Sequence, residues 1–212
     1  MSNTAPAQPI RLHRMHLSGH SHRVELFLSL LGLPYDMVDV NLGQGEHKSP
    51  AFLRMNGFGQ VPVIQDGDVT LADSNAILVY LAGRYAPGEW LPSDPLGAAR
   101  VQRWLSAAAG PLAFGAAAAR VMEVFKREGD RTPFIERGHQ LLAVMEQELA
   151  GQPFLAGERA TLADVANYSY VARAPEGGVS LQPYPAVRAW LERIEALPRF
   201  VPFARTPVGL AA

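Results

Sequence analysis

The stretch from Gln60 to Ser74 limits most what this chain can fold into, because its pattern changes from strand to turn to strand to helix. Residues 61–64 are rich in β-branched side chains, and Asp66-Gly67 is typical of a two-residue hairpin turn. Residues 69–71 indicate a second short strand, and residues 75–85 have the apolar spacing of a helix. The stretch therefore predicts a β-hairpin that leads directly into a helix.

Pro62 indicates that the first strand begins beside a binding site for a peptide. A proline cannot donate to a sheet ladder, so it belongs at a strand start or an edge. If Pro62 is cis, the backbone of Val61 faces outward and can hold an extended peptide as one more strand. Ser74 adds a hydroxyl at a helix N-terminus, which suits a carboxylate, and Asp73 suits an ammonium. A peptide with a free amino acid at one end, such as glutathione, fits these features.

Three short segments together resemble the glutathione-binding signature of the glutathione S-transferase family. They are Gln60-Val61-Pro62, Asp73-Ser74-Asn75-Ala76-Ile77 and Tyr80-Leu81. The family usually has Glu-Ser where this chain has Asp73-Ser74, which shortens one side chain and keeps its charge. The alternative is a strand-turn-helix fragment without a ligand. The resemblance implies that glutathione binds to Gln60, Val61, Pro62, Asp73 and Ser74.

Composition favours a soluble globular protein. The 212 residues are 48% hydrophobic, enough for one or two packed domains. The net charge of −1, without blocks of like charge, argues against nucleic acid or an anionic membrane as partner. The absence of cysteine excludes disulfides, thiolate metal sites and a cysteine nucleophile. We expect Met1–Pro9 to be a loose tail, and it lacks a signal-peptide pattern. No stretch reaches roughly 18 apolar residues, so we expect a cytoplasmic protein.

The first part of the chain alternates strand and helix patterns. Residues 10–15 indicate a strand, residues 24–31 a helix and residues 35–40 a second strand. Residues 50–55 indicate a short helix ahead of the hairpin. This β-α-β-α-β-β-α order is close to the thioredoxin-like arrangement in the N-terminal domain of glutathione transferases. We therefore assign residues 10–86 to an α/β thioredoxin-like, glutathione-binding domain.

The rest of the chain has helical patterns only. After a linker with proline and glycine, a helix is expected over residues 96–126, with a break near Gly110-Pro111. Thr161 and Asp164 form a capping-box pattern, and a box of this type opens the buried helix of the second domain in the resembled family. Further helices are expected over residues 131–149 and 184–196. We assign residues 94–212 to an all-α helical domain that forms the hydrophobic substrate site.

Ser18 is the candidate for activating the sulfur of glutathione. The resemblance implies that the side chain at this position meets the sulfur, as in serine-type, bacterial-like cytosolic glutathione transferases. A hydroxyl can donate to a thiolate, and a helix N-terminus adds positive potential. Together they can supply the roughly 2.7 kcal/mol that lowers a thiol pKa by about two units. Ser21 competes for this role, and a plain loop or N-cap function is the alternative for Ser18.

His47 and Lys48 lie in a polar loop ahead of the short helix. In several classes of the resembled family, a His-Lys pair here contacts the glycine carboxylate of glutathione. Lys48 would supply charge and His47 a hydrogen-bond donor. The amide of Gln60 can bind a terminal carboxylate as well. A solvated loop is the alternative for the His-Lys pair.

The hydrophobic substrate is expected between the loop ahead of the first helix and the first helices of the second domain. Candidate wall residues are Leu17, His20, Ser106, Ala109, Phe114 and Val121. An apolar face of this kind is also what a core helix has.

Four of the six histidines are close in sequence, which raises the question of a metal. His13, His16, His20 and His22 have irregular spacing, and the one carboxylate near them is Glu25. We expect no metal, and we expect His20 to line the mouth of the active site.

We expect a two-domain glutathione transferase with glutathione as co-substrate, acting in detoxification. Its reaction would be attack of the glutathione thiolate on an electrophilic substrate. A glutathione-dependent disulfide reductase or peroxidase is the alternative on the same fold, and a non-catalytic glutathione-binding regulatory protein is the alternative from another class. The resemblance, with the apolar helices after Asp94, implies a homodimer. The physiological acceptor stays open.

Overall fold

The computed structural model describes residues 5–210 of the chain. The first four residues of the expected N-terminal tail and the last two of the expected helical domain lie outside this range. The chain forms two compact units. The first runs to Leu91 and takes in the later segment Leu197–Ala204, and the second comprises Pro92–Ala196 and the chain from Arg205.

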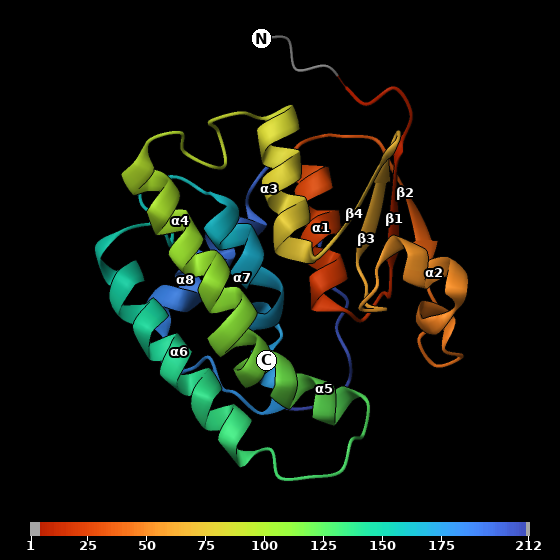
Figure 1. Ribbon diagram of the computed structural model, residues 1–212. Coiled ribbons are helices and arrows are strands. Elements are labelled where there is room, and N and C mark those ends of the chain that lie inside the picture. The colour runs from red at the N-terminus through yellow and green to blue at the C-terminus, as the bar shows by residue number, and fades with distance from the viewer. Residues whose placement is uncertain (1–4, 211–212) are drawn as a thin grey trace. The chain divides into compact units, whose positions relative to one another are not determined.

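The first unit is built on a four-stranded sheet with the order β2-β1-β3-β4 (Figure 1). The strands are β1 (Ile10–Arg14), β2 (Tyr35–Asp39), β3 (Val63–Asp66) and β4 (Val69–Ala72). β1 is parallel to β2 and antiparallel to β3, and β3 is antiparallel to β4 through the expected hairpin. The mixed sheet confirms the thioredoxin-like class of this unit.

Helices cover both faces of this sheet. α1 (Gly19–Leu30) and α3 (Ser74–Tyr85) lie side by side on one face, and α2 (Pro50–Met55) lies on the other (Figure 1). Phe52 of α2 packs with Val63 of β3 in one hydrophobic cluster. Successive side chains of a strand point to opposite faces, so the side chain of Val63 is on the face that α2 covers. α1 begins at Gly19 and not at Val24 as we expected. The apolar run starts at Val24, but the side chain of Ser18 already caps a polar first turn.

Asp66 holds the hairpin against α3. Its Oδ2 accepts hydrogen bonds from the hydroxyls of Tyr80 at 2.7 Å and Tyr85 at 2.6 Å. Burial, and then its own hydrogen bond to Asp66, raises the pKa of Tyr80 to about 12. Because the end of the hairpin leads into α3, these contacts position the start of α3, where the expected ligand groups lie.

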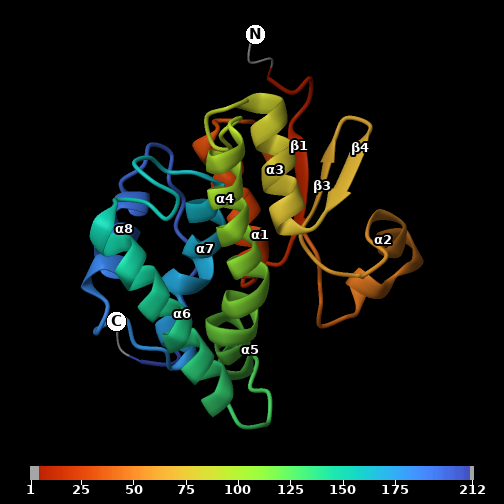
Figure 2. The ribbon, with the colours of Figure 1, turned by 60° about the vertical axis from the view of Figure 1, so that its left-hand side comes forward.

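The second unit is helical, as we expected. Its helices are α4 (Pro95–Ala107), η2 (Ala108–Ala117), α5 (Ala118–Val124), α6 (Thr132–Gly151), α7 (Leu162–Ala172), η3 (Ala174–Gly177) and α8 (Pro185–Glu195) (Figure 2). Among the residues described in this unit, β structure is limited to one isolated bridge between Phe154 and Gly157. An all-α unit after an α/β unit confirms the predicted fold class.

The expected helix break near Gly110-Pro111 lies elsewhere. The chain stays helical through Pro111 in the wider π-helical turns of η2, and the non-helical residue is Gly115, at φ −118° and ψ −110°. A Cβ at Gly115 would lie 2.9 Å from the backbone nitrogen of Gly138 in α6. The helix therefore breaks at Gly115, where its backbone approaches the backbone of α6 closely. Pro111 is accommodated within η2 and does not break the helix.

The run from Pro95 to Val124 is long and apolar enough to cross a membrane by length and composition alone. This corrects our expectation that no stretch reaches that length, since many alanines together raise the hydropathy of the run. Its α4 and η2 parts pack against α6 and α7. Core helices of soluble proteins pass the same test, so the run is weak evidence for a membrane span.

The capping box at the start of α7 is confirmed. The Asp164 carboxylate accepts from the N–H of Thr161 at 2.8 Å, from the N–H of Leu155 at 2.9 Å and from the indole of Trp190 at 2.9 Å. Asp164 is fully buried, and burial raises the pKa of its carboxyl, although these hydrogen bonds act to lower it. One side chain thus joins the start of α7, the preceding loop and α8.

Candidate functional site

The start of α1 separates the roles of its two serines. Ser18 is the N-cap, and its Oγ accepts the N–H of Ser21 at 3.2 Å. Ser18 is half-buried and retains the proton of its hydroxyl for donation. Ser21 is 1% exposed, and its Oγ accepts the N–H of Met15 at 3.3 Å. The hydroxyl that lies nearer the surface is therefore that of Ser18.

Asp73 combines a helix cap with an unusual backbone. Its Oδ1 accepts the N–H of Ala76 at 2.9 Å, so it caps α3. Its φ of 70° and ψ of 122° are rare for a residue with a side chain, and such conformations cluster at functional sites. The residue is exposed, so its carboxylate can also meet a ligand.

Ser74 directs its hydroxyl inward. The side chain is buried, and its Oγ accepts from Arg23 Nη1 at 2.8 Å and lies 3.3 Å from His20 Nδ1. Arg23 Nη1 also donates to Asn75 Oδ1 at 2.8 Å. The start of α1 and the start of α3 are thus joined. At Ser74, the groups that can attract an anion are chiefly the N-terminus of α3 and the positive charge of Arg23.

The Val61-Pro62 peptide bond is cis, as we expected. β3 begins at Val63, which pairs with Ala72 at the end of β4. Val61 and Pro62 therefore precede the ladder and are not part of its pairing. Whether an extended peptide adds along this backbone stays a prediction.

The loops around Gly59 bring the other expected ligand residues together. Lys48 Nζ donates to the carbonyl of Phe58 at 3.1 Å, and a Cβ at Gly59 would lie 2.8 Å from the carbonyl oxygen of His47. Gly59 has a φ of 58°, which glycine adopts without strain. Asn56 Nδ2 donates to the carbonyl of Gln60 at 2.8 Å. Lys48, within η1 (Glu46–Lys48), and Gln60 are both exposed, next to the cis peptide.

Sequence reasoning missed Arg23 and the contact of His20 with Ser74. Arg23 is 1% exposed although it carries a charge. The available signal was its position four residues before Phe27, on the buried face of α1. Burial, and then the charge of Arg23, lowers the pKa of His20 to about 3, so its imidazole is neutral at neutral pH.

The four neighbouring histidines turn to different partners. His13 Nε2 lies 2.9 Å from Gln65 Oε1, whereas His22 Nε2 lies 3.0 Å from the carbonyl of Val201, and His20 contacts Ser74. His16 is exposed. Within residues 5–210, no group of three or more histidines, aspartates or glutamates is arranged to hold a metal.

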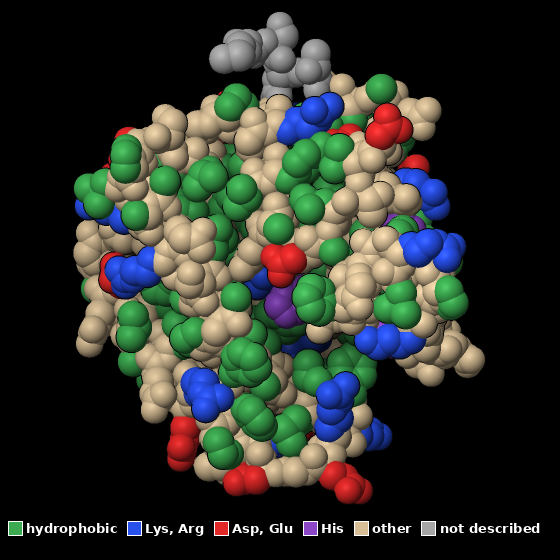
Figure 3. Space-filling model, in the orientation of Figure 1, with side chains coloured by type: hydrophobic (Ala, Val, Ile, Leu, Met, Phe, Trp, Pro, Cys, Tyr) green, Lys and Arg blue, Asp and Glu red, His purple; other side chains and the backbone are tan. Residues whose placement is uncertain are grey.

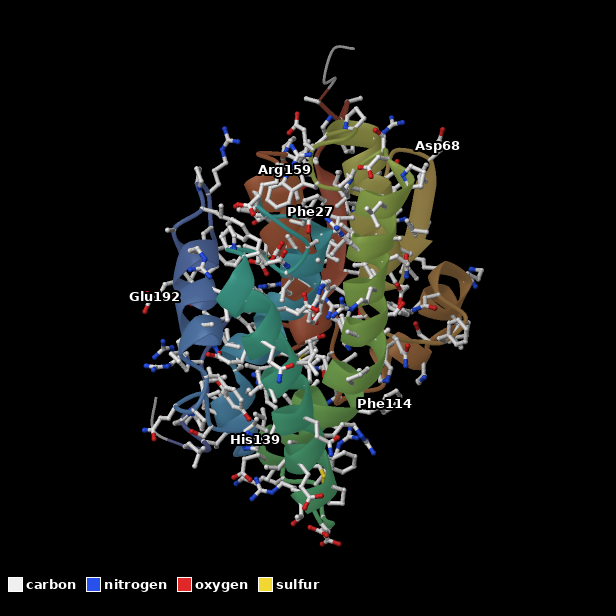
Figure 4. All side chains as sticks on the ribbon, turned by 90° about the vertical axis from the view of Figure 1, so that its left-hand side faces the viewer. Phe27, Asp68, Phe114, His139, Arg159 and Glu192 are labelled. Atoms are coloured by element: carbon white, nitrogen blue, oxygen red, sulfur yellow. The ribbon has the colours of Figure 1, made fainter. Side chains whose placement is uncertain are left out.

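The candidate wall residues do not share one hollow within their own units. In the first unit, Leu17 and His20 are half-buried. In the second, Ser106 and Ala109 are exposed and Val121 is partly buried. Phe114 is 61% exposed and lines a hollow of about 610 Å³ beside α6 (Figure 4). Whether these residues contact a substrate stays a prediction.

That hollow is mainly apolar. Figure 3 shows hydrophobic side chains over the α4–α6 region of one face, with Lys and Arg side chains among them. Arg137 Nη1 donates to the carbonyl of Phe114 at 2.8 Å, next to the break at Gly115. The remaining lining residues are Arg103, Trp104, Ala107, Gly110, Pro111, Gln140, Leu141 and Val144.

Comparison with known families gives two matches, one in each unit. Residues 17–84 match the N-terminal domain of glutathione S-transferase, and residues 135–198 match its C-terminal domain. The first match contains Ser18, His47, Lys48, the cis peptide and Asp73-Ser74. The glutathione-binding candidates chosen from the sequence therefore lie within the matched N-terminal domain, whereas the wall candidates Ser106, Ala109, Phe114 and Val121 lie outside both matches.

Individual proteins agree with these matches over most of the chain. Glutathione S-transferase 3 of Zea mays is 37% identical, covering 91% of each chain. Maleylacetoacetate isomerase of Pseudomonas aeruginosa is 35% identical, covering 90% of this chain and 93% of that protein. The crystal structure of a glutathione S-transferase from Pseudomonas fluorescens superposes with a TM-score of 0.87 at 33% identity, covering 93% of this chain and all of that one. The chain therefore belongs to the glutathione S-transferase family and is a glutathione transferase.

Proposed function

We propose that the chain binds glutathione along the cis-proline edge of its first unit and activates the thiol as a thiolate that attacks an electrophilic carbon. The observation that carries this proposal is the joining of the starts of α1 and α3 through Arg23 and Ser74. It places the cap residue Ser18 and the cap residue Asp73 on two linked helix N-termini. Two such termini favour anions, here a thiolate and a carboxylate.

Each part of the tripeptide has a group of suitable chemistry. The backbone of Val61 and Pro62 pairs with the cysteinyl backbone, and Asp73 meets the ammonium of the γ-glutamyl part. The carboxylate of the γ-glutamyl part meets the N-terminus of α3 at Ser74. His47, Lys48 and Gln60 hold the glycine carboxylate, since Lys48 and Gln60 are exposed beside the cis peptide. Ser18 donates its hydroxyl proton to the sulfur.

A second candidate reaction is isomerisation of maleylacetoacetate, favoured by the 35% identical relative that bears this name. It would use the same thiolate, which adds to a double bond and leaves again after rotation. Disulfide or peroxide reduction and non-catalytic glutathione binding remain as alternatives, as the family fold supports several functions. The substrate wall of Leu17, His20, Ser106, Ala109, Phe114 and Val121 belongs to the same proposal.

We further propose a cytoplasmic homodimer. The apolar hollow beside α6, with the exposed Phe114 and Val144, supports an interface on the second unit. A surface of this composition is better covered by a second copy than left in water. No metal is part of the proposed chemistry.

The test begins with retention on glutathione resin. Retained protein is then assayed with glutathione and an aryl halide, a disulfide, a peroxide or maleylacetoacetate, each in a separate assay. Turnover of the aryl halide supports the proposal, and preferred turnover of maleylacetoacetate, the disulfide or the peroxide selects an alternative. Retention without any turnover identifies a binding protein, and failure to bind glutathione refutes the proposal. Asp73→Asn is the matched variant for binding because it keeps a capping oxygen on α3 and removes the charge.

A further inference from the structure

The hydroxyl proton of Ser74 has one acceptor within reach. Among the residues that the structure describes, the contacts of Ser74 Oγ are Arg23 Nη1 at 2.8 Å and His20 Nδ1 at 3.3 Å. A guanidinium can only donate, so Arg23 occupies a lone pair of Oγ. The side chain is 4% exposed, and a buried hydroxyl proton without an acceptor is costly. His20 Nδ1 is therefore the acceptor.

This geometry selects one form of the His20 imidazole. A ring that accepts at Nδ1 carries its proton on Nε2. A second proton, at Nδ1, would face the O–H of Ser74 and place a cation near Arg23. Burial and the charge of Arg23 lower the pKa of His20, which agrees with a ring that does not take up this second proton. Asp73, the carboxylate next to Ser74 in the chain, is exposed and accepts from the N–H of Ala76.

We propose that His20 is a positioning residue of the glutathione site, held by Ser74 as the neutral tautomer with its proton on Nε2, and that it is not the base that accepts the thiol proton. The inference rests on the proposed function. When the thiol ionises, the S–H bond breaks, the electron pair stays on sulfur and the proton passes to solvent water. Stabilisation of the anion then falls to Ser18 and the start of α1. His20 acts through Ser74, which it helps to orient at the start of α3.

Two substitutions of His20 separate a positioning residue from a base. His20→Asn places an amide oxygen near the position of Nδ1, so it can still accept from Ser74, but it cannot take up a proton at neutral pH. His20→Leu removes the acceptor. A general base contributes about 10²- to 10⁴-fold, so a base role predicts losses of that size in both variants. We expect His20→Leu to lose about tenfold more kcat/KM than His20→Asn, because only the leucine variant leaves the Ser74 proton without a side-chain acceptor.

The tautomer itself is measured without glutathione. Long-range proton–nitrogen NMR spectra of the ¹⁵N-labelled full chain report which ring nitrogen is protonated, and the signals missing in His20→Asn identify His20. We expect the Nε2–H form, unchanged from about pH 8 to about pH 5, whereas a free histidine titrates within that range. Ser74→Ala should weaken the preference for this form, because it removes the hydroxyl donor to Nδ1.

Three results would overturn the inference: a proton on Nδ1, a titration near the ordinary histidine range, or equal losses in His20→Asn and His20→Leu. The spectra of the parent protein decide the tautomer even if the leucine variant does not fold. Failure to bind glutathione resin would refute the proposed function and the positioning role, but it would leave the tautomer measurement standing. The two failures are therefore distinguishable.

Discussion

Replacing Ser18 by glycine should weaken activation of the glutathione thiol and leave glutathione affinity nearly unchanged. Ser18 Oγ accepts the N–H of Ser21 at 3.2 Å, so the proton of its hydroxyl is what it can offer to a thiolate. Glycine is the matched substitution because an N-cap glycine costs only a few tenths of a kcal/mol, whereas alanine costs about 1 kcal/mol. Ser18→Ala should show the same catalytic loss with an added loss of stability.

The size of the effect follows from the loss of one hydrogen bond to an anion. The pKa of the bound thiol should rise by about one to two units, equivalent to about 1.4–2.7 kcal/mol. Near pH 7 this leaves roughly ten- to hundredfold less thiolate, partly offset by the higher nucleophilicity of a more basic sulfur. Because the thiolate forms without help at high pH, the deficit in kcat/KM should shrink as pH rises.

The assay is a titration of thiolate absorbance in the glutathione complexes of the parent, Ser18→Gly and Ser18→Thr. Threonine keeps a hydroxyl and should restore most of the shift. Ser21→Ala is the control for the neighbouring serine, whose Oγ accepts from Met15 inside the unit. An unmoved titration in Ser18→Gly, together with an upward shift in Ser21→Ala, would show that the role belongs to the other serine.

Four further predictions test the binding site, the interface and the packing. Asp73→Asn and Asp73→Ala should each weaken glutathione binding by about 1.5–3 kcal/mol and Asp73→Glu by less; calorimetry giving the parent Kd for all three would exclude an ammonium contact. Light scattering should give the mass of two chains, and Val144→Glu should give one; a single-chain mass for the parent contradicts the dimer. Asp164→Asn should destabilise the fold by at least about 2 kcal/mol, because an NH₂ group replaces an acceptor for buried N–H donors; an unchanged urea midpoint would refute this. The pKa of His20 falls from 6.5 to about 3 on folding, so its contribution to the free energy of unfolding should be complete above pH 6.5 and decline as pH drops toward 3. This decline should be less steep in His20→Asn, and parallel curves of urea stability against pH for the two proteins would refute the prediction.

Local sequence patterns were sufficient to predict the structure where the conformation depends on neighbouring residues. The hairpin over Val63–Ala72 and the cis bond at Pro62 depend on turn and proline chemistry, which a short segment contains. The box at Thr161 and Asp164 likewise spans a single helical turn. These features could be predicted because few residues outside the segment compete with them.

Long-range contacts explain what the sequence did not indicate. The break at Gly115 depends on the backbone of Gly138, which is remote in the chain. The segment Leu197–Ala204 returns to the first unit through the carbonyls of Val201 and Arg199, which bond to His22 Nε2 at 3.0 Å and Ser29 Oγ at 2.6 Å. Backbone carbonyls leave no residue-type signal, so a pattern search cannot find them.

The candidate site combines both kinds of information. Ser18, Pro62 and Asp73 lie at the ends of elements, where a cap or a turn defines the residue type, and they could be chosen from the sequence. Arg23 gave only the signal of its position on the buried face of α1, and its charge is unexplained until Ser74 and Asn75 are placed against it. A buried cation costs free energy unless it is hydrogen-bonded, and Arg23 makes such bonds across the two helix starts. Arg23, which sequence reasoning missed, therefore links α1 to Ser74 and Asn75 at the start of α3.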